Sequence, residues 1–242
     1  MRNRAALLVT VLAALATAVP GALAEQPRKP VPARTKTAQN QPVLPNPIGV
    51  QPAAVTKSGT AGVDQSQRAL VERVNAYLSG MQTLVGDFVQ VGPDRSRTEG
   101  RFYLQKPGRI RFEYNPPSPL ELIADGDAVV VRDRKLATQD VYPLSQTPLR
   151  FLLAERIDLM KDTNLISVAS DETFVTVVIE ERQTLGGSHR VMLMFGAKDL
   201  QLKQWTVTDP QGYETTVAVY NLDTPKKLDP NLFKINYERV LQ

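Results

Sequence analysis

Between residues 64 and 81 the apolar positions repeat with the period of a helix. In the segment DQSQRALVERVNAYLSGM, apolar side chains fall at i, i+4, i+7, i+8 and i+11, namely Leu70, Val74, Tyr77, Leu78 and Met81. Such a stripe is typical of an amphipathic helix that packs on a core. Asp64 or Ser66 is expected to cap its first turn, and Gly80 or Gly86 to mark the region of its end.

From residue 84 onward the apolar period changes to two. About a dozen short runs rich in β-branched and aromatic residues follow, spaced roughly 8–12 residues apart, as in an all-β sandwich or barrel. The runs are 84–91, 98–107, 109–114, 120–126, 127–133, 135–141, 166–170, 174–181, 190–196, 201–209, 214–222 and 233–237. Turn residues separate neighbouring runs, as in Asp125-Gly126, Asp209-Pro210-Gln211-Gly212 and Leu185-Gly186-Gly187-Ser188.

One helical segment interrupts the predicted strands. In 145–162, SQTPLRFLLAERIDLMKD, apolar residues recur at helical spacing from Leu149 to Leu153. Thr147 is expected to cap this helix, with Pro148 in its first turn. We therefore expect a strongly curved sheet with helices over its open side.

The stretch 104–117, LQKPGRIRFEYNPP, interleaves cations with aromatic rings and has two interpretations. It could stack nucleic-acid bases, or it could be a strand with one wet face. The alternation favours the strand, because Ile110, Phe112 and Tyr114 share one face while the charged residues between them share the other. The charged face is expected to be exposed to solvent.

Charge is distributed unevenly along the chain. The whole sequence has 29 cations and 25 anions, but Arg2, Arg4 and five cations in 25–63 lie outside the predicted folded part. Because 25–63 has one anion, residues 64–242 carry 22 cations and 24 anions, a net charge of −2. A net acidic domain is poorly suited to neutralise phosphates, so no nucleic-acid partner is expected.

The first 63 residues have the composition of an export signal and a linker. A basic start, a long uncharged stretch and Ala22-Leu23-Ala24 predict a cleaved secretory signal peptide at 1–24, although an uncleaved membrane anchor is the alternative. Residues 25–63 contain seven prolines and no aromatic residue, which predicts a disordered linker. The folded domain is expected at 64–242.

Catalytic side chains are scarce. The chain has no cysteine, which excludes thiol catalysis and thiolate metal sites, and its one histidine, His189, is expected to be an ordinary loop residue. Asp125 and Asp127 flank Gly126 as a tight turn requires, so this pair is interpreted as turn chemistry rather than acid–base chemistry. We expect no enzyme, no metal and no cofactor.

An ordered series of motifs resembles a known family. The series is DFVQ at 87–90, EGRFYLQKPGRIRFEYNPP at 99–117, LIADG at 122–126 and TPLRFLL at 147–153. It resembles the periplasmic outer-membrane lipoprotein carrier family, LolA, over roughly 66–238. The resemblance implies a mainly β fold with a few helices, an unclosed antiparallel barrel of about eleven strands under an α-helical lid.

The resemblance also implies a function and its partners. Family members bind the acyl chains of lipoproteins in a hydrophobic cavity. They collect them from an inner-membrane lipoprotein-releasing ABC exporter and deliver them to an outer-membrane acceptor or to the outer-membrane surface. A monomeric periplasmic carrier of acylated lipoproteins is therefore expected.

The resemblance and the strand alternation together suggest site residues. The predicted lipid-binding cavity is lined by Phe88, Leu104, Ile110, Phe112, Tyr114, Leu122, Val129, Val131, Leu149, Leu152 and Leu153. Lys106 stands where the family usually has an arginine that latches the lid, and a carbonyl of the 149–153 helix is its expected partner. The alternative is an ordinary solvated lysine at the end of a strand. Phe112 stands where tryptophan is frequent, whereas the single tryptophan, Trp205, is distant in the sequence.

Two alternatives remain. A barrel of this kind also suits a periplasmic carrier or sensor of another lipid or glycolipid. A hydrolase would have to rely on carboxylates alone, and a titratable pair facing into the cavity would be its mark.

Overall fold

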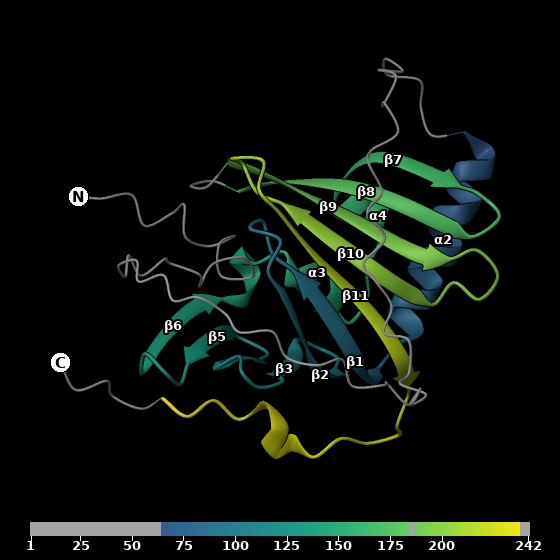
Figure 1. Cartoon of the computed structure of the whole chain (residues 1–242). Helices are drawn as coiled ribbons and strands as arrows, with labels where there is room; N and C mark the ends of the chain where they lie inside the picture. The colour runs from purple at the N-terminus through teal and green to yellow at the C-terminus, as the bar shows by residue number, and fades with distance from the viewer. Residues whose placement is uncertain (1–63, 184–186, 238–242) are drawn as a thin grey trace, which may run out of the picture.

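The described chain forms one curved sheet that wraps around short helices (Figure 1). The computed structural model describes residues 64–183 and 187–237. Its eleven strands pair antiparallel in the order β6-β5-β4-β3-β2-β1-β11-β10-β9-β8-β7, with β6 and β7 as free edges. This confirms an unclosed antiparallel barrel. The signal peptide and linker predicted for residues 1–63 lie outside the described residues.

The strands follow the predicted runs closely. They are β1 (Thr83–Val91), β2 (Arg97–Gln105), β3 (Arg109–Tyr114), β4 (Leu120–Asp125), β5 (Ala128–Asp133), β6 (Thr138–Pro143), β7 (Asn164–Ser170), β8 (Phe174–Gln183), β9 (Gly187–Gly196), β10 (Leu202–Thr208) and β11 (Glu214–Asp223). Between β4 and β5, the Asp125 carboxylate accepts the N–H groups of Asp127 and Ala128, and Gly126 has φ +120°. The interpretation of this segment as a turn is confirmed.

The N-terminal helix α2 (Gln65–Gly80) is built as its sequence predicts. The Asp64 side chain accepts the N–H of Gln67, and the Gln67 side chain accepts the N–H of Asp64, which forms a capping box. The predicted stripe faces the sheet, with Val74 and Leu78 completely buried. Gly80 ends the helix, whereas Gly86 lies within β1.

The mid-chain helical segment is broken into three short pieces, so the prediction of one helix was wrong. They are η2 (Leu144–Gln146), α3 (Leu149–Leu153) and α4 (Leu159–Asp162). Thr147 does not cap α3 with its side chain; its hydroxyl donates to the Leu144 carbonyl at 2.9 Å. Pro148 is the N-cap of α3 rather than a first-turn residue. Breaking the segment lets α3 enter the concave side of the sheet while α4 packs near β7 (Figure 1).

The run 233–237 is not a strand, which corrects the last predicted element. It follows η3 (Pro230–Phe233) and crosses the outer face of the sheet, where Ile235 packs against Ile123 and Val130. The charged face of β3 is consequently not fully solvated. The Arg111 guanidinium donates to the Leu232 carbonyl at 3.1 Å and pairs with Glu113 and Glu121.

His189 also differs from its expected place. It lies on β9 with 2% of its surface exposed, directly opposite Glu181 on β8. The period of two that places Val191 and Leu193 in the core continues back through His189, so the residue belongs to the concave face rather than to a loop.

Candidate functional site

The concave face of the sheet carries one continuous apolar cluster. All eleven predicted lining residues belong to it, and each is at most 9% exposed. Phe88 lies on β1, Leu104 on β2, Ile110, Phe112 and Tyr114 on β3, Leu122 on β4, Val129 and Val131 on β5, and Leu149, Leu152 and Leu153 on α3. Residues from five strands and one helix therefore converge on a single surface.

Aromatic rings form the centre of this surface. The Phe88 ring lies edge-on to Phe112 and Tyr114, with centroids 4.9 and 5.1 Å away. Gly100 makes this possible, because a Cβ there would lie 2.8 Å from the Phe88 ring. Trp205 reaches the same group from β10, 6.3 Å from Phe112, although the sequence separates them widely.

Few polar groups lie in the cluster, and two of them form a hydrogen bond with each other. The Tyr114 hydroxyl donates to the Gln90 side-chain oxygen at 2.8 Å. Burial raises the pKa of Tyr114, so it is a neutral donor at any physiological pH. The indole nitrogen of Trp205 is buried without a hydrogen-bond partner among the described residues.

The turn from β2 to β3 holds two helices over the concave face. The Lys106 ammonium donates to the Leu78 carbonyl in the last turn of α2. Two residues later, the Gly108 N–H donates to the Leu153 carbonyl at the end of α3, at 2.9 Å. The sequence led us to expect a bond from the Lys106 side chain to α3. The side chain bonds α2 instead, and the backbone N–H of Gly108 bonds α3.

The position of Lys106 explains its protonation behaviour. The side chain is 6% exposed and lies beside the apolar cluster. Burial lowers its pKa from 10.5 to about 8, because the charged form loses hydration. The carbonyl at the helix C-terminus favours the ammonium and so keeps this lysine useful as a donor.

A second polar contact, which was not predicted from the sequence, holds α3 at its other end. Arg150 donates to one carboxylate oxygen of Glu181 through Nε and Nη2, at 2.7 and 2.6 Å. Its guanidinium also lies 4.3 Å from the ring centroid of Phe151. A signal existed in the sequence, since the alternation through Val177 and Ile179 places Glu181 on the apolar face.

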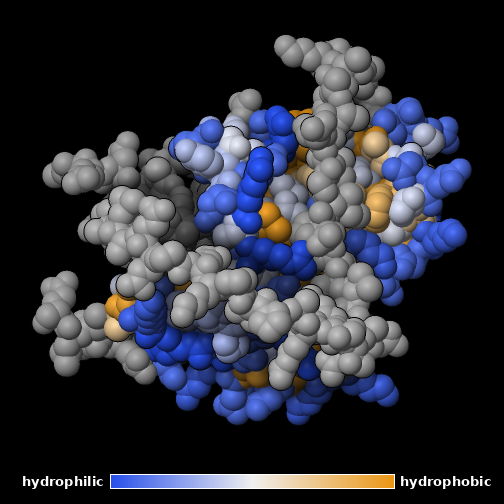
Figure 2. Space-filling model, viewed as in Figure 1, coloured by the Kyte–Doolittle hydropathy of each residue, from blue (hydrophilic) through white to orange (hydrophobic). Residues whose placement is uncertain are grey.

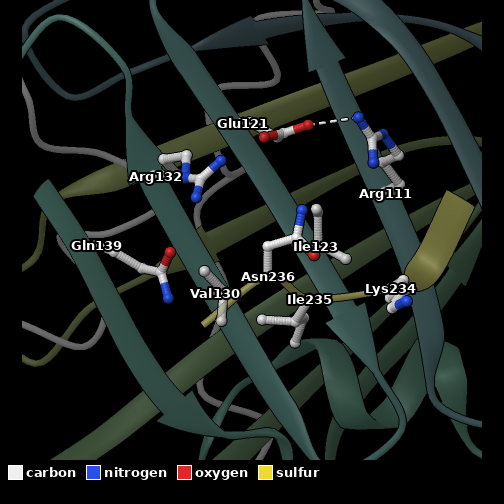
Figure 3. A pocket seen from close by; sticks show the side chains of 9 residues that line it. All are labelled: Arg111, Glu121, Ile123, Val130, Arg132, Gln139, Lys234, Ile235 and Asn236. Atoms are coloured by element: carbon white, nitrogen blue, oxygen red, sulfur yellow. Dashed lines mark hydrogen bonds and ion pairs between the residues drawn. The ribbon is translucent and has the colours of Figure 1, made fainter. Parts of the chain in front are cut away.

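A separate hollow lies on the opposite, outer face of the sheet (Figure 3). Its volume is about 150 Å³, and the C-terminal segment forms one wall. It is lined by Arg111, Glu121, Ile123, Val130, Arg132, Gln139, Lys234, Ile235 and Asn236. So polar and small a hollow does not suit an acyl chain, which leaves the concave face as the candidate site.

The described molecular surface that faces the viewer in Figure 2 is mostly hydrophilic. Where the described residues are seen in Figure 2, hydrophilic side chains predominate and apolar ones form small separate areas.

Within 64–183 and 187–237, no three His, Cys, Asp or Glu side chains gather in a way that would hold a metal ion. The helices in these same ranges are all too short or too polar to cross a bilayer.

An open antiparallel half-barrel with an apolar concave face under short helices defines the structural class. The family model described as outer membrane lipoprotein carrier protein LolA matches residues 79–236, well over half of the chain. The chain belongs to the LolA family.

Two relatives are similar in sequence to this chain over most of their own length. An outer-membrane lipoprotein carrier protein of Methylococcus capsulatus is 27% identical over 181 residues, covering 71% of this chain and 86% of the relative. That of Methylobacillus flagellatus is 26% identical over 160 residues, covering 63% and 77%. The crystal structure of a LolA superfamily protein from Nitrosomonas europaea covers 69% of this chain and 99% of its own, at 10% identity and a TM-score of 0.39.

Proposed function

We propose that this protein carries acylated lipoproteins across the periplasm and binds their acyl chains on the concave face. The observation that carries this proposal is the single apolar cluster on that face, to which the five-residue helix α3 contributes Leu149, Leu152 and Leu153. Membership of the LolA family, whose relatives bear the name of lipoprotein carriers, supports the same conclusion.

The energetics require such a carrier. Exposing one acyl chain of about 14 methylenes to water costs about 11 kcal/mol, at about 0.8 kcal/mol per methylene. A lipidated protein therefore does not cross an aqueous compartment alone at a useful rate. The carrier must also release its cargo, so its own closed state has to compete with the bound acyl chains.

Helix α3 supplies this competition. Leu149, Leu152 and Leu153 occupy the concave face in the closed structure, so acyl chains and α3 exclude each other there. Loading moves α3 outward, and return of its leucines to the cluster favours release. The inner-membrane exporter and an outer-membrane acceptor are the expected partners at the two ends of this cycle.

Lys106 acts as a latch of the closed state in this proposal. Its bond to Leu78 joins the β2–β3 turn to α2, while Gly108 in the same turn holds the end of α3. Lys106→Leu is expected to load cargo normally but to deliver it several-fold more slowly, because a β2–β3 turn that is no longer fixed to α2 holds the returning end of α3 less firmly. Lys106→Arg should deliver at least as well as the parent, since a guanidinium offers more donors.

A delivery assay tests the latch. Loaded carrier is mixed with outer-membrane acceptor, and transferred lipoprotein is followed over time. Lys203→Leu is the matched control, because Lys203 pairs with Asp199 at the surface. Equal delivery rates for the parent and Lys106→Leu would leave Lys106 without a role in release.

The cargo itself is identified by mass spectrometry. Protein purified from its native compartment without detergent is extracted, and the bound lipids and lipopeptides are measured. Diacylglyceryl-modified N-terminal peptides are expected. Recovery of a phospholipid or glycolipid alone would instead make the protein a carrier or sensor of that lipid.

A further inference from the structure

A polar row closes one end of the concave face. Glu181, His189 and Asp209 lie on or directly after the neighbouring strands β8, β9 and β10, and each is at most 8% exposed. Glu181 and His189 are direct cross-strand partners. Ile179 stands two residues before Glu181 and Val191 two residues after His189, and both belong to the apolar cluster. The side chains of Glu181 and His189 are therefore directed toward the concave side as well.

This row has hydrogen-bonding capacity that the described residues do not use. One carboxylate oxygen of Glu181 and Nδ1 of His189 are buried without a partner. Asp209 differs, because its carboxylate accepts the N–H groups of Gln211 and Tyr213 in the following turn. Buried polar atoms are nearly always paired in folded proteins, so the unpartnered oxygen of Glu181 is available to a ligand.

In the closed structure Arg150 of α3 is the only cation paired with Glu181 among the residues that the structure describes. The Arg150 side chain is 40% exposed and lines two open clefts, with volumes of about 500 and 430 Å³. When α3 leaves the concave face, Arg150 leaves with it. Glu181 then loses its counter-ion on an otherwise apolar face, which is unfavourable for a carboxylate.

We propose that Glu181 is the counter-ion for an ammonium group at the polar end of the bound amphiphile, in the place that Arg150 occupies in the closed state. This inference rests on the proposed function, because acyl chains must first displace α3. The ligand it specifies has acyl chains and a cation a few bonds away. A free α-amine of a diacylglyceryl-modified N-terminus and an ethanolamine headgroup both have this chemistry.

Replacement of Arg150 by the ammonium of the ligand accounts for the hydrogen-bond geometry at Glu181 and for a selectivity among amphiphiles. Arg150 places two of its donors on one carboxylate oxygen, so the second oxygen is free for the incoming group to make its first contact. The same carboxylate repels anionic amphiphiles, which gives the site a selectivity that an apolar surface alone lacks. Burial raises the pKa of Glu181 and Arg150 opposes this rise, so a cation at this position favours the ionised form.

The experiment compares two synthetic lipopeptides that differ in one charge. Both carry an S-dipalmitoylglyceryl cysteine and the same neutral peptide, with the α-amine free in one and acetylated in the other. Delipidated full-length protein is titrated at pH 7, and binding is followed by the emission of its single tryptophan, Trp205, which packs against Phe112 in the cluster.

The expected result is a ratio of affinities. The parent should bind the free amine about tenfold more tightly than the acetylated form, and Glu181→Gln should reduce this ratio to within about twofold. Loss of the Arg150 contact loosens α3 for both ligands equally, so the ratio isolates the charge interaction. Glu180→Gln is the matched control, because Glu180 is the adjacent carboxylate and accepts from Asn164 instead; its ratio should equal the parent's.

A second pair of ligands separates the two sources of the ammonium. Phosphatidylethanolamine and phosphatidylglycerol with the same chains are compared in the same assay. If Glu181→Gln lowers the affinity ratio of the lipopeptide pair alone, the site is assigned to the N-terminus of the cargo. If it lowers the ratio of the phospholipid pair alone, the site is assigned to a headgroup. A ratio near one for the parent in both pairs overturns the inference about Glu181 and leaves the carrier function intact. Failure of every ligand to bind would refute the proposed function itself.

Discussion

Helices α2 and α3 cover the same apolar face but are attached in different ways. Helix α2 has 16 residues and several contacts with other elements, including Gln67 to the Val168 carbonyl, Asn75 to the Leu159 N–H and Tyr77 to the Leu202 N–H. Helix α3 has five residues, and its polar attachments are Gly108 to Leu153 and Arg150 to Glu181. The difference is consistent with the proposal that α2 belongs to the scaffold and that α3 moves when a ligand binds.

This division follows from local stability. A short helix gains little from its own hydrogen bonds and depends on the contacts that dock it. A segment with few anchors opens at a lower free energy than the global unfolding of the domain. Three measurements test whether the two helices differ in this way, and a fourth tests whether residues 25–63 contribute to the domain that both helices cover.

The largest effect is expected on α2. Leu78→Ala removes a side chain with 0% exposure and should lower the free energy of unfolding by about 3 kcal/mol, since the scaffold cannot close the space. Urea denaturation of the parent and the variant provides the measurement. A loss below about 1 kcal/mol would show that α2 is docked as loosely as α3.

The next effect concerns the pH dependence of the α2 attachment. Lys106 titrates at about 8 when buried and near 10.5 when exposed, so between these values the unfolded chain binds more protons than the folded one. Stability should therefore rise with pH across this window, and Lys106→Leu should lack this rise. From pH 8 to 9.5 the free energy of unfolding should rise by about 1 to 2 kcal/mol more for the parent than for the variant. Urea denaturation at each pH provides the measurement. Parallel pH profiles would mean that Lys106 remains hydrated.

A smaller effect is expected for the matching substitution on α3. Leu152 is 4% exposed, yet Leu152→Ala should cost only about 1 kcal/mol, because the loss cannot exceed the free energy that docks α3. The same variant should bind dipalmitoyl lipopeptide more tightly, since its closed state competes less well. Losses of equal size at Leu78 and Leu152 would contradict the division into scaffold and lid.

The smallest effect is expected from deleting residues 25–63. Their prolines and lack of aromatic residues predict no contribution to the core that both helices cover. The thermal midpoint of the deletion variant should stay within about 4 °C of the parent, which corresponds to about 1 kcal/mol. A larger fall would mean that this segment packs on the domain.

The sequence alone determined which side chains face inward. Period two in the strands and period 3.6 in α2 identify the concave surface, because side-chain direction depends only on local backbone geometry. All eleven predicted lining residues consequently fall in one cluster, and Asp64 caps α2 as expected. The motifs also sufficed to indicate the LolA family, which the family model confirms.

Only the tertiary structure decided which distant groups meet. It brings Trp205 to Phe112, Lys106 to Leu78 rather than to α3, and Arg150 to Glu181. It also breaks 145–162 into three pieces and lays the 233–237 segment on the outer face. These outcomes depend on how the sheet curves and on which surfaces remain to be covered. Local propensity carries no information about either, because both arise from packing between residues far apart in the chain.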